Sequence, residues 1–471
     1  MKDKFAVATV LALSLVLAVS ATISAAPPTP QATSAFDQKV ISQVNTGKLL
    51  EHDKYLSVGI GQRVAASPEE KRAASYIKGV FESYGYDVQV QPFPWEKNVA
   101  YVKALAPTVQ NLLVSAGSSS SLTAAGGITA GVVDCGLGNA PTDFPPAVAG
   151  KIALMKRAET PPGSGTGESS STVTQKIRNA QAAGAVAALI QNFDWHIFSA
   201  STDGDATITI PFATMNSEAG AVLMQPGATA TFQINHYSGS QNVIATRKPV
   251  NKDTDTGKIV VISSHMDSVA ASPGADDNAS GTSVVLELSR VLRDLPIDTE
   301  VRFVVFGTEE GGCVGSKYYV AQPSAELGRT IADFNMDLIG NNWVEGNKLF
   351  VLTQAKDNPS TYGPNLISET VFATLERLGL KGSPMDGGLG YRPGSDQVSF
   401  YNAGMKDGAN VSWRKNDQGA AGMEPWYHQP YDTFDRISPE RITLGAQIVG
   451  ASAYSILRPN TPSLTNSATA Q

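Results

Sequence analysis

Side chains that bind zinc lie at the ends of several predicted strands in the second half of this 471-residue chain. Zinc in proteins is held by imidazole nitrogen and carboxylate oxygen, and a catalytic zinc keeps one position for water. Two zinc ions that share a water, with a carboxylate as base, can hydrolyse peptide bonds. The residues that meet these requirements are the ligands His265, Asp277, Glu310, Asp337 and His428, with Asp267 and Glu309 beside them. The sequence therefore predicts a zinc peptidase.

The positions of the ligands suggest how they divide between two ions. Two zincs about 3.5–4 Å apart need a carboxylate between them to offset their mutual repulsion. Asp277 lies in the glycine-rich loop GADDNASG, where its short side chain suits this bridging role. We expect His265 and Asp337 to complete one zinc site. Glu310 and His428 are expected to complete the other.

The adjacent residues Glu309 and Glu310 are expected to have different roles. Successive side chains at the end of a strand diverge, so one can bind metal while its neighbour reaches the water. We assign Glu310 to zinc and Glu309 as the general base, which deprotonates the water and then protonates the leaving amine. Asp267, two residues after His265, is placed to accept the second ring proton of this histidine and so to set its tautomer.

Buried strands must bring these residues to one edge of a sheet. The apolar segments KIVVISS, VRFVVFGT and IADFNM precede His265, Glu309 and Asp337, and an amphipathic helix is predicted over 281–295. Apolar strands that alternate with helices indicate an α/β fold with a mostly parallel sheet sandwiched by helices. In such sheets, ligands gather beyond the carboxyl ends of the strands. Further predictions are a helix over 69–84, a strand over 87–93 and a closing helix over 439–457.

The segment from about Ala104 to Tyr237 differs in character from the rest. It has short strand patterns, Gly/Ser-rich turns and one strong helix pattern, and its His, Asp and Glu residues do not cluster. Its order, and the phrase KIRNAQAAGAVAALI in particular, resembles the protease-associated (PA) domain found inside several exported peptidases. We expect an inserted β-rich α/β domain over 106–237 and a catalytic domain over 36–105 and 238–458; one continuous domain is the alternative. As a hypothesis, the insertion caps the cleft or limits substrate size.

The N-terminus has the pattern of an export signal. Lys2 and Lys4 precede an apolar run from Phe5 to about Val19, and small residues follow up to Ala26. We predict a signal peptide over 1–26, a spacer over 27–35, a disordered tail over 459–471, and a secreted protein, extracellular or periplasmic. A membrane anchor is the alternative, but the run is short for a span.

The net charge limits the classes of partner that the protein is expected to bind. The net charge of −7 provides no basic field that would attract nucleic acid or anionic lipid. We therefore expect no nucleic-acid or membrane partner, and a monomer. Neither Cys135 nor Cys313 has a Cys or His at ligand spacing, and two buried thiols are expected, with a disulfide as the alternative. His52, His196 and His236 lack a ligand pattern and are expected to be structural.

Around the predicted ligands the chain resembles the co-catalytic dizinc aminopeptidases of metallopeptidase family 28. The matching phrases are SSHMDSV, PGADDNASG, FGTEEGGCVGS, FNMDLIG and WYHQPYDT. The resemblance implies a zinc-peptidase fold of the phosphorylase/hydrolase-like type, two zinc ions as cofactors, and peptide or protein N-termini as substrates. It implies the ligands and the base already assigned, with Asp267 as support for His265. It also implies that Tyr427 hydrogen-bonds the oxyanion of the tetrahedral intermediate.

The chain departs from the family pattern near the specificity segment. Ser395-Asp396-Gln397 stands where members often have Ser-Asp-His, and Arg392 is displaced from the position of an arginine that helps to bind the substrate amine in some bacterial relatives. One alternative function is a zinc carboxypeptidase of the glutamate carboxypeptidase type, which needs cations such as Arg392, Arg414 or Lys415 for the terminal carboxylate. Another is a non-catalytic, receptor-like binding protein, although no ligand is lost.

Overall fold

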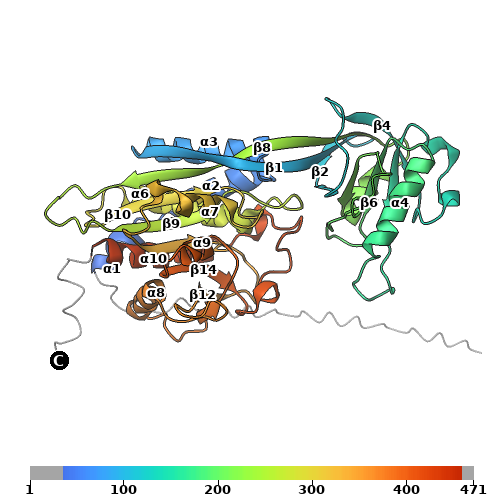
Figure 1. Cartoon of the computed structure of the whole chain (residues 1–471). Coiled ribbons are helices and arrows are strands. Elements are labelled where there is room, and N and C mark those ends of the chain that lie inside the picture. The colour runs from blue at the N-terminus through green and yellow to red at the C-terminus, as the bar shows by residue number, and fades with distance from the viewer. Residues whose placement is uncertain (1–34, 459–471) are drawn as a thin grey trace, which may run out of the picture.

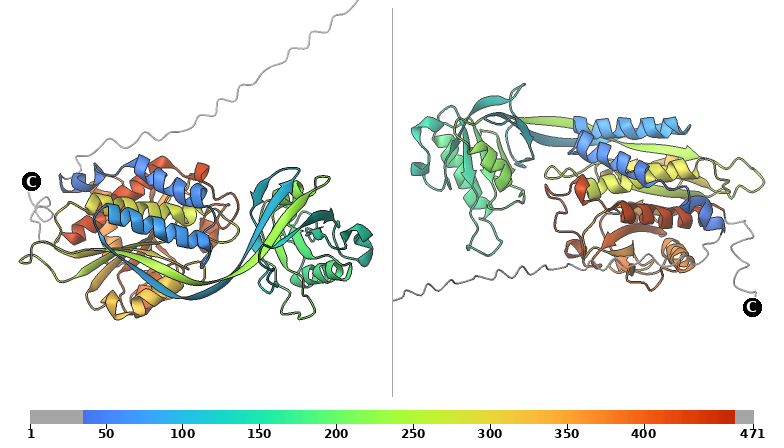
Figure 2. Two further views of the ribbon diagram at one scale, coloured as in Figure 1. Left: turned by 90° about the horizontal axis from the view of Figure 1, so that it is seen from above. Right: turned by 180° about the vertical axis from the view of Figure 1, so that it is seen from behind.

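The computed structural model of the protein describes residues 35–458 (Figure 1). The predicted signal peptide, residues 27–34 of the predicted spacer and the predicted tail lie outside the described residues. Within residues 35–458, no helix has the length and apolar character needed to cross a membrane. Two long strands join a larger region to a smaller one that lies to its side (Figures 1 and 2). We call the larger region the main domain and the smaller one, which holds β2–β7 with α4 and α5, the inserted domain.

The main domain is built on a mostly parallel sheet, as the sequence predicted. The strand order is β13-β12-β14-β11-β9-β10-β8. β9 pairs in parallel with β10 and β11, β11 with β14 and β12 with β13, whereas β8 and β14 are antiparallel to β10 and β12. The strands are β8 (Thr229–Arg247), β9 (Ile259–His265), β10 (Glu300–Phe306), β11 (Thr330–Met336), β12 (Lys348–Thr353), β13 (Asp386–Tyr391) and β14 (Gly408–Arg414).

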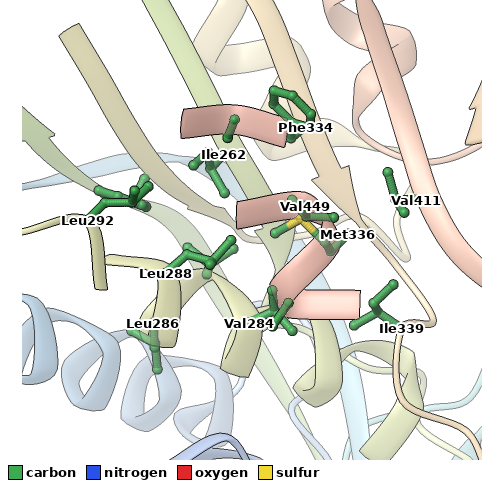
Figure 3. Close-up of a cluster of buried hydrophobic side chains, with 14 of the residues drawn as sticks. Ile262, Val284, Leu286, Leu288, Leu292, Phe334, Met336, Ile339, Val411 and Val449 are labelled. Atoms are coloured by element: carbon green, nitrogen blue, oxygen red, sulfur yellow. The ribbon is translucent and has the colours of Figure 1, made fainter. Parts of the chain in front are cut away.

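Helices cover both faces of this sheet because alternate strand residues point to opposite sides. Val260 and Ile262 face one core and Ile259 and Val261 face another. The first core, part of which is shown in Figure 3, includes buried residues of α1 (Ala35–Ile41), α2 (Thr46–Lys54), α3 (Pro68–Ser83), α6 (Gly281–Leu292), α8 (Leu366–Arg377) and α10 (Pro439–Leu457). The second includes residues of α7 (Val314–Ala321) and α9 (Gln397–Asn402). The central strands β9 and β10 are therefore buried along their whole length, which explains their nearly continuous apolar sequences.

Local capping signals account for the helix ends. The Ser67 side chain accepts from the backbone N–H of Glu70 at the start of α3, and Ser438 caps α10 in the same way, each followed by a proline. The closing helix has the predicted bounds, and α3 differs from its prediction by one residue at each end. The helix predicted over 281–295 ends earlier, at Leu292. The strand predicted over 87–93 was too short, because β1 continues to Ala106.

That longer strand connects the two domains. β1 (Asp87–Ala106) pairs antiparallel with β8 from Asp87 opposite Thr246 to Ala106 opposite Thr229, with two irregularities, between Phe93 and Glu96 and between Ala104 and Ala106. The ribbon leaves the main domain and enters the inserted domain (Figures 1 and 2). The elements there are β2 (Gln110–Leu112), β3 (Ser115–Ala116), β4 (Ile128–Asp134), β5 (Ile152–Lys156), α4 (Ser170–Ala182), β6 (Ala187–Gln191), β7 (Phe212–Met215) and α5 (Ser217–Leu223). They pack around cores of their own.

Candidate metal centre

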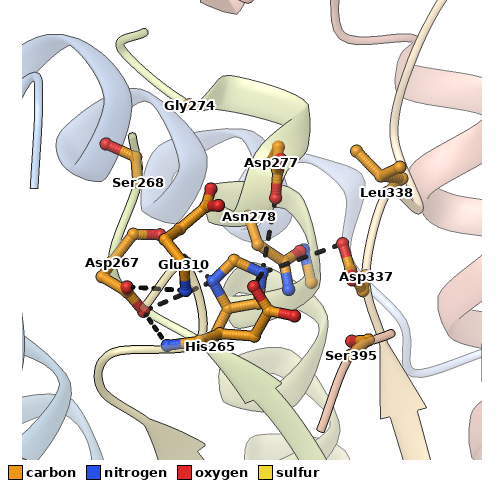
Figure 4. A network of polar contacts seen from close by, with 12 residues as sticks. His265, Asp267, Ser268, Gly274, Asp277, Asn278, Glu310, Asp337, Leu338 and Ser395 are labelled. Carbon is orange, nitrogen blue, oxygen red and sulfur yellow. Dashed lines mark hydrogen bonds and ion pairs between the residues drawn. The ribbon is translucent and has the colours of Figure 1, made fainter. Parts of the chain in front are cut away.

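The predicted ligands converge beyond the carboxyl ends of the central strands: Figure 4 shows His265, Asp277, Glu310 and Asp337, and His428 lies beside Asp277 and Glu310. His265 is the last residue of β9, Glu310 follows β10, and Asp337 follows β11 directly. Asp277 comes from the short helical loop Ala275–Ser280, and His428 from the loop between β14 and α10. Parallel strands end at one edge of the sheet, so side chains distant in sequence meet there.

The side chains form two groups that share Asp277. In the inner group, His265 Nε2 lies 3.3 Å from Asp277 Oδ1 and 3.8 Å from Asp337 Oδ1. In the outer group, His428 Nε2 lies 3.1 Å from Asp277 Oδ2 and 3.1 Å from Glu310 Oε2. Within each group, one ligand atom per residue lies within 4.8 Å of the others. The two oxygens of Asp277 thus face the two histidines, the geometry expected of a bridging carboxylate.

The two groups differ in burial. The side chains of His265 and Asp337 are each 1% exposed, whereas those of Glu310 and His428 are 11% and 34% exposed. The inner group lies at the base of the site, and the outer group is its open side.

Polar atoms without hydrogen bonds show that the groups fit metal ions. His265 Nε2, Glu310 Oε1 and Asp337 Oδ1 are buried and make no hydrogen bond with the described residues. Buried polar atoms are nearly always hydrogen-bonded, so such a cluster needs another partner. Converging carboxylates also repel one another unless a cation compensates them. Imidazole with carboxylate is the donor set of zinc, and the residues fit one zinc in each group.

Asp267 supports the site in a different way from the prediction. The nearest oxygen to His265 Nδ1 is the main-chain carbonyl of Asp267, at 3.1 Å, and its carboxylate is farther, at 3.5 Å. The carboxylate instead accepts hydrogen bonds from the backbone N–H groups of Glu309 and Glu310, at 2.9 and 3.1 Å. Asp267 therefore orients His265 mainly through its backbone and holds the turn of the two glutamates through its side chain.

Glu309 lies on the inner side of the centre. Its Oε2 is 3.9 Å from His265 Nε2, and its Oε1 accepts a weak hydrogen bond from Cys313 Sγ at 3.6 Å. Burial raises the pKa of the Glu309 carboxyl well above its usual value, and the charges of Glu310 and Asp337 raise it further, against the opposing effect of His265. The raised pKa of Glu309 thus reflects its burial among other carboxylates.

Asp432 is a supporting residue that the sequence analysis missed. Its carboxylate accepts from the backbone N–H groups of Asp276 and Asp277, at 2.7 and 3.1 Å, and so holds the loop of the bridging residue. Asp276 in turn accepts from the N–H of Gly340 at 2.6 Å. The available signal was the position of Asp432 in WYHQPYDT, four residues after His428.

The residues around the specificity segment lie close to the inner group. Arg392 Nη2 is 2.8 Å from Asp337 Oδ2. Gln397, which stands where family members often have histidine, donates to the backbone of Arg392 at 3.3 Å. The ring of Tyr427 stacks on His428, with 3.8 Å between ring centroids.

Other sequence predictions concern residues away from the two groups. Arg414 donates to the carbonyls of Asn416 and Gly419, and Lys415 pairs with Glu345. The two cysteines are free thiols; Cys135 is buried, but Cys313 is only partly buried because it lies in the turn after Glu309, contrary to the expectation for it. The three remaining histidines contact Tyr76, Asp194 and Asn98, and in residues 35–458 none belongs to a metal-binding group.

Comparisons with known proteins agree with this geometry. Residues 242–453 match the model of peptidase family M28, and residues 113–223 match that of the PA domain. The chain is 35% identical over 408 residues to aminopeptidase YwaD of Bacillus subtilis, and the aligned region covers 86% of this chain and 83% of YwaD. It is 30% identical over 398 residues to an aminopeptidase of Pseudomonas aeruginosa, covering 77% and 68% of the two chains.

Solved structures show the same relationship. BSAP, a zinc aminopeptidase from Bacillus subtilis, superposes with a TM-score of 0.59 at 32% identity, covering 88% of this chain and 95% of that one. The aminopeptidase from Aneurinibacillus sp. strain AM-1 gives a TM-score of 0.55 at 32% identity, covering 89% and 95%.

Proposed function

This chain belongs to peptidase family M28, and from that premise we propose that it is a two-zinc aminopeptidase in which Glu309 is the general base. The observation that carries the proposal is the pair of ligand groups joined through Asp277. The relatives described as aminopeptidases support the reaction class. The description of BSAP as a zinc aminopeptidase supports the metal.

The residues around the groups have distinct tasks in this proposal. Zinc, when bound, polarises the scissile carbonyl and lowers the pKa of the attacking water. Glu309 takes the proton of that water and delivers it to the leaving amine. Tyr427, whose ring stacks on His428, donates a hydrogen bond to the oxyanion. Tyr427→Phe is accordingly expected to lower kcat by about 10²–10³-fold, the usual cost of one oxyanion donor.

The charges near the inner group favour an aminopeptidase over a carboxypeptidase. Glu309 and Asp337 lie within 3.9 Å of His265 Nε2, and carboxylates attract the ammonium group of a peptide N-terminus. Two of the three cations named for a carboxypeptidase are paired with carboxylates: Arg392 with Asp337, and Lys415 with Glu345. The third, Arg414, donates to the main-chain carbonyls of Asn416 and Gly419.

A pair of substrates tests the reaction class. We expect the purified protein to hydrolyse leucine p-nitroanilide and to leave the N-acetylated compound intact. Elemental analysis of the same sample is expected to give two zinc ions per chain, and a chelator is expected to abolish the activity. Cleavage of N-blocked substrates alone would favour the carboxypeptidase.

We also propose that the protein is exported and acts as a monomer on peptide or protein N-termini. The lysines and apolar run of residues 1–26 support export, and the net charge of −7 argues against nucleic acid as a partner. Mass spectrometry of the protein recovered from the culture medium or periplasm is expected to place the mature N-terminus after residue 26. A full-length product retained in the membrane would contradict export.

A further inference from the structure

The segment that carries His428 contacts two other parts of the molecule. We call residues 428–432 the histidine segment. Toward the metal centre it supplies His428 as a ligand and Asp432 as the acceptor for the N–H groups of the Asp277 loop. Toward the inserted domain it presents Gln429 and Tyr431. One short segment therefore connects His428 and the Asp277 loop to a separate domain.

The contacts with the inserted domain are specific. Gln429 Oε1 accepts a hydrogen bond from the backbone N–H of Ile197 at 3.0 Å. The Tyr431 hydroxyl donates to Glu218, and its ring packs edge-on against Trp195 with 5.3 Å between centroids. Figure 1 shows the inserted domain beside the C-terminal loops of the main domain, away from the ribbon that joins the two domains. These contacts form a second connection between the domains.

The inserted domain's side of this contact is well ordered by its own hydrogen bonds. Asp194 accepts from Asn192 at 2.7 Å and from the backbone N–H of His196 at 3.0 Å, and its carbonyl accepts from Ser217 N–H at 2.9 Å. The last bond ties the loop of Trp195 to the start of α5, which carries Glu218. These hydrogen bonds hold Trp195 and Glu218, the residues that contact Tyr431, in position relative to each other.

The histidine segment needs such support. His428 has a φ of 61°, a left-handed conformation that side chains other than glycine rarely adopt. Residues in such conformations persist when their surroundings hold them in place. The His428 side chain is also 34% exposed, so core packing contributes little to its position.

We propose that the inserted domain positions the outer zinc-binding group by holding Gln429 and Tyr431. The inference rests on the proposed two-zinc function. It gives the inserted domain a role in metal retention in addition to any effect on substrate size. Residues 195, 197 and 218 are positioning residues, because they act through the histidine segment and touch neither metal nor substrate.

Zinc affinity measured on the full-length mature protein tests this proposal. Glu218→Gln keeps the shape of the side chain and removes its charge. We expect it to weaken binding of the more loosely held zinc by about three- to tenfold, the range for an ordinary hydrogen bond in a protein. Binding of the tighter zinc is expected to stay the same. Trp195→Ala is expected to have a larger effect in the same direction. Competition with a zinc chelator at graded free zinc measures both affinities.

Kinetics separate this role from a role in substrate binding. At limiting zinc, Glu218→Gln is expected to lower kcat for leucine p-nitroanilide with KM unchanged, and added zinc is expected to restore it. Asp203→Asn is the matched control, because it removes a charge from an exposed residue of the inserted domain that is not one of those in contact with the histidine segment. Tyr431→Phe is expected to have at least the effect of Glu218→Gln, since it removes the hydrogen bond, whereas glutamine keeps an acceptor oxygen and loses only the charge.

Two outcomes would overturn the proposal. One is an unchanged affinity for both zincs in Glu218→Gln and Trp195→Ala. The other is a change in KM for long peptides alone, which would make the contact part of a substrate wall. Failure of the two-zinc function is distinguishable from both, because the unsubstituted protein would then bind fewer than two zincs or lack aminopeptidase activity.

Discussion

The two ligand groups share Asp277 but are built in different ways. The inner group takes His265 and Asp337 from the ends of adjacent parallel strands, and both side chains are 1% exposed. The outer group takes Glu310 and His428 from loops, with side chains 11% and 34% exposed. The sheet therefore determines the inner group, whereas contacts between loops determine the outer one. We expect this difference to appear as a difference in zinc affinity.

The largest expected effect is that of Glu309→Gln, which tests whether a residue beside the ligand groups contributes to catalysis without binding metal. Glu309→Gln is expected to lower kcat by about 10²–10⁴-fold, the usual contribution of a general base. Both zinc ions are expected to remain, because Glu309 belongs to neither ligand group. Kinetics with leucine p-nitroanilide and elemental analysis on one sample measure both quantities. Glu310→Gln is the matched comparison and is expected to lose the outer zinc. Full activity of Glu309→Gln with both zincs bound would remove Glu309 from the mechanism.

Removing one histidine from each group tests the comparison directly. His428→Ala leaves His265, Asp277 and Asp337 in place, so we expect it to keep one zinc after dialysis against a weak chelator. His265→Ala removes a ligand of the inner group and leaves Glu310 and His428, which are more exposed. We therefore expect it to retain less zinc than His428→Ala. Loss of a supporting residue alone typically weakens metal binding by about 10–100-fold, and loss of a ligand is expected to exceed that. Equal zinc retention by the two variants would mean that burial does not distinguish the groups.

Substitution of a residue that supports both ligand groups is expected to weaken zinc binding by both. Asp432→Asn removes the charge of the carboxylate that accepts hydrogen bonds from the backbone N–H groups of Asp276 and Asp277, at 2.7 and 3.1 Å. Because Asp277 bridges the groups, we expect both zincs to bind about 10–100-fold more weakly. Chelator competition measures the two affinities, and Asp435→Asn, nearby in sequence, is the control. A loss confined to one zinc would argue against Asp277 as the bridge.

The same contrast explains what the sequence could predict. The positions of His265 and Asp337 follow from strand ends, because the apolar strands and their parallel order are readable from the sequence. The mostly parallel sheet was predicted for the same reason. The predicted contact of the Asp267 carboxylate with His265 was less accurate, because the choice between a side-chain and a backbone oxygen depends on the turn that follows β10.

Contacts between loops were beyond the sequence patterns. The hydrogen bonds of Asp432 join segments 155 residues apart, and the bond of Gln429 with Ile197 joins segments 232 residues apart. The ion pair of Arg392 with Asp337 likewise joins segments that are distant along the chain. Loop conformation has no periodic pattern, so these partners appear only in three dimensions.

A buried histidine outside the metal centre provides the smallest test of the comparison. His52 is 4% exposed, and its Nδ1 lies 2.7 Å from the hydroxyl of Tyr76. Carboxylates surround His265, whereas burial dominates at His52 and lowers the pKa of its imidazole from 6.5 to about 4. Between these values the unfolded chain binds a proton at this residue that the folded protein does not. The contribution of neutral His52 to the free energy of unfolding is therefore complete above pH 6.5 and is lost as the pH falls toward 4.

The expected loss from His52 is at most ~3 kcal/mol, from about 1.4 kcal/mol for each pH unit between the two pKa values. Thermal unfolding of the zinc-free protein between pH 7 and 4, compared with His52→Gln, measures it. The variant is expected to be less stable at pH 7 but to lose less stability on acidification, since glutamine does not titrate. Because zinc is absent from both samples, a difference between them reports on this histidine and not on the ligands. Parallel pH profiles would mean that His52 has the same pKa in the folded and unfolded protein, and that burial does not set the charge of a histidine in this core.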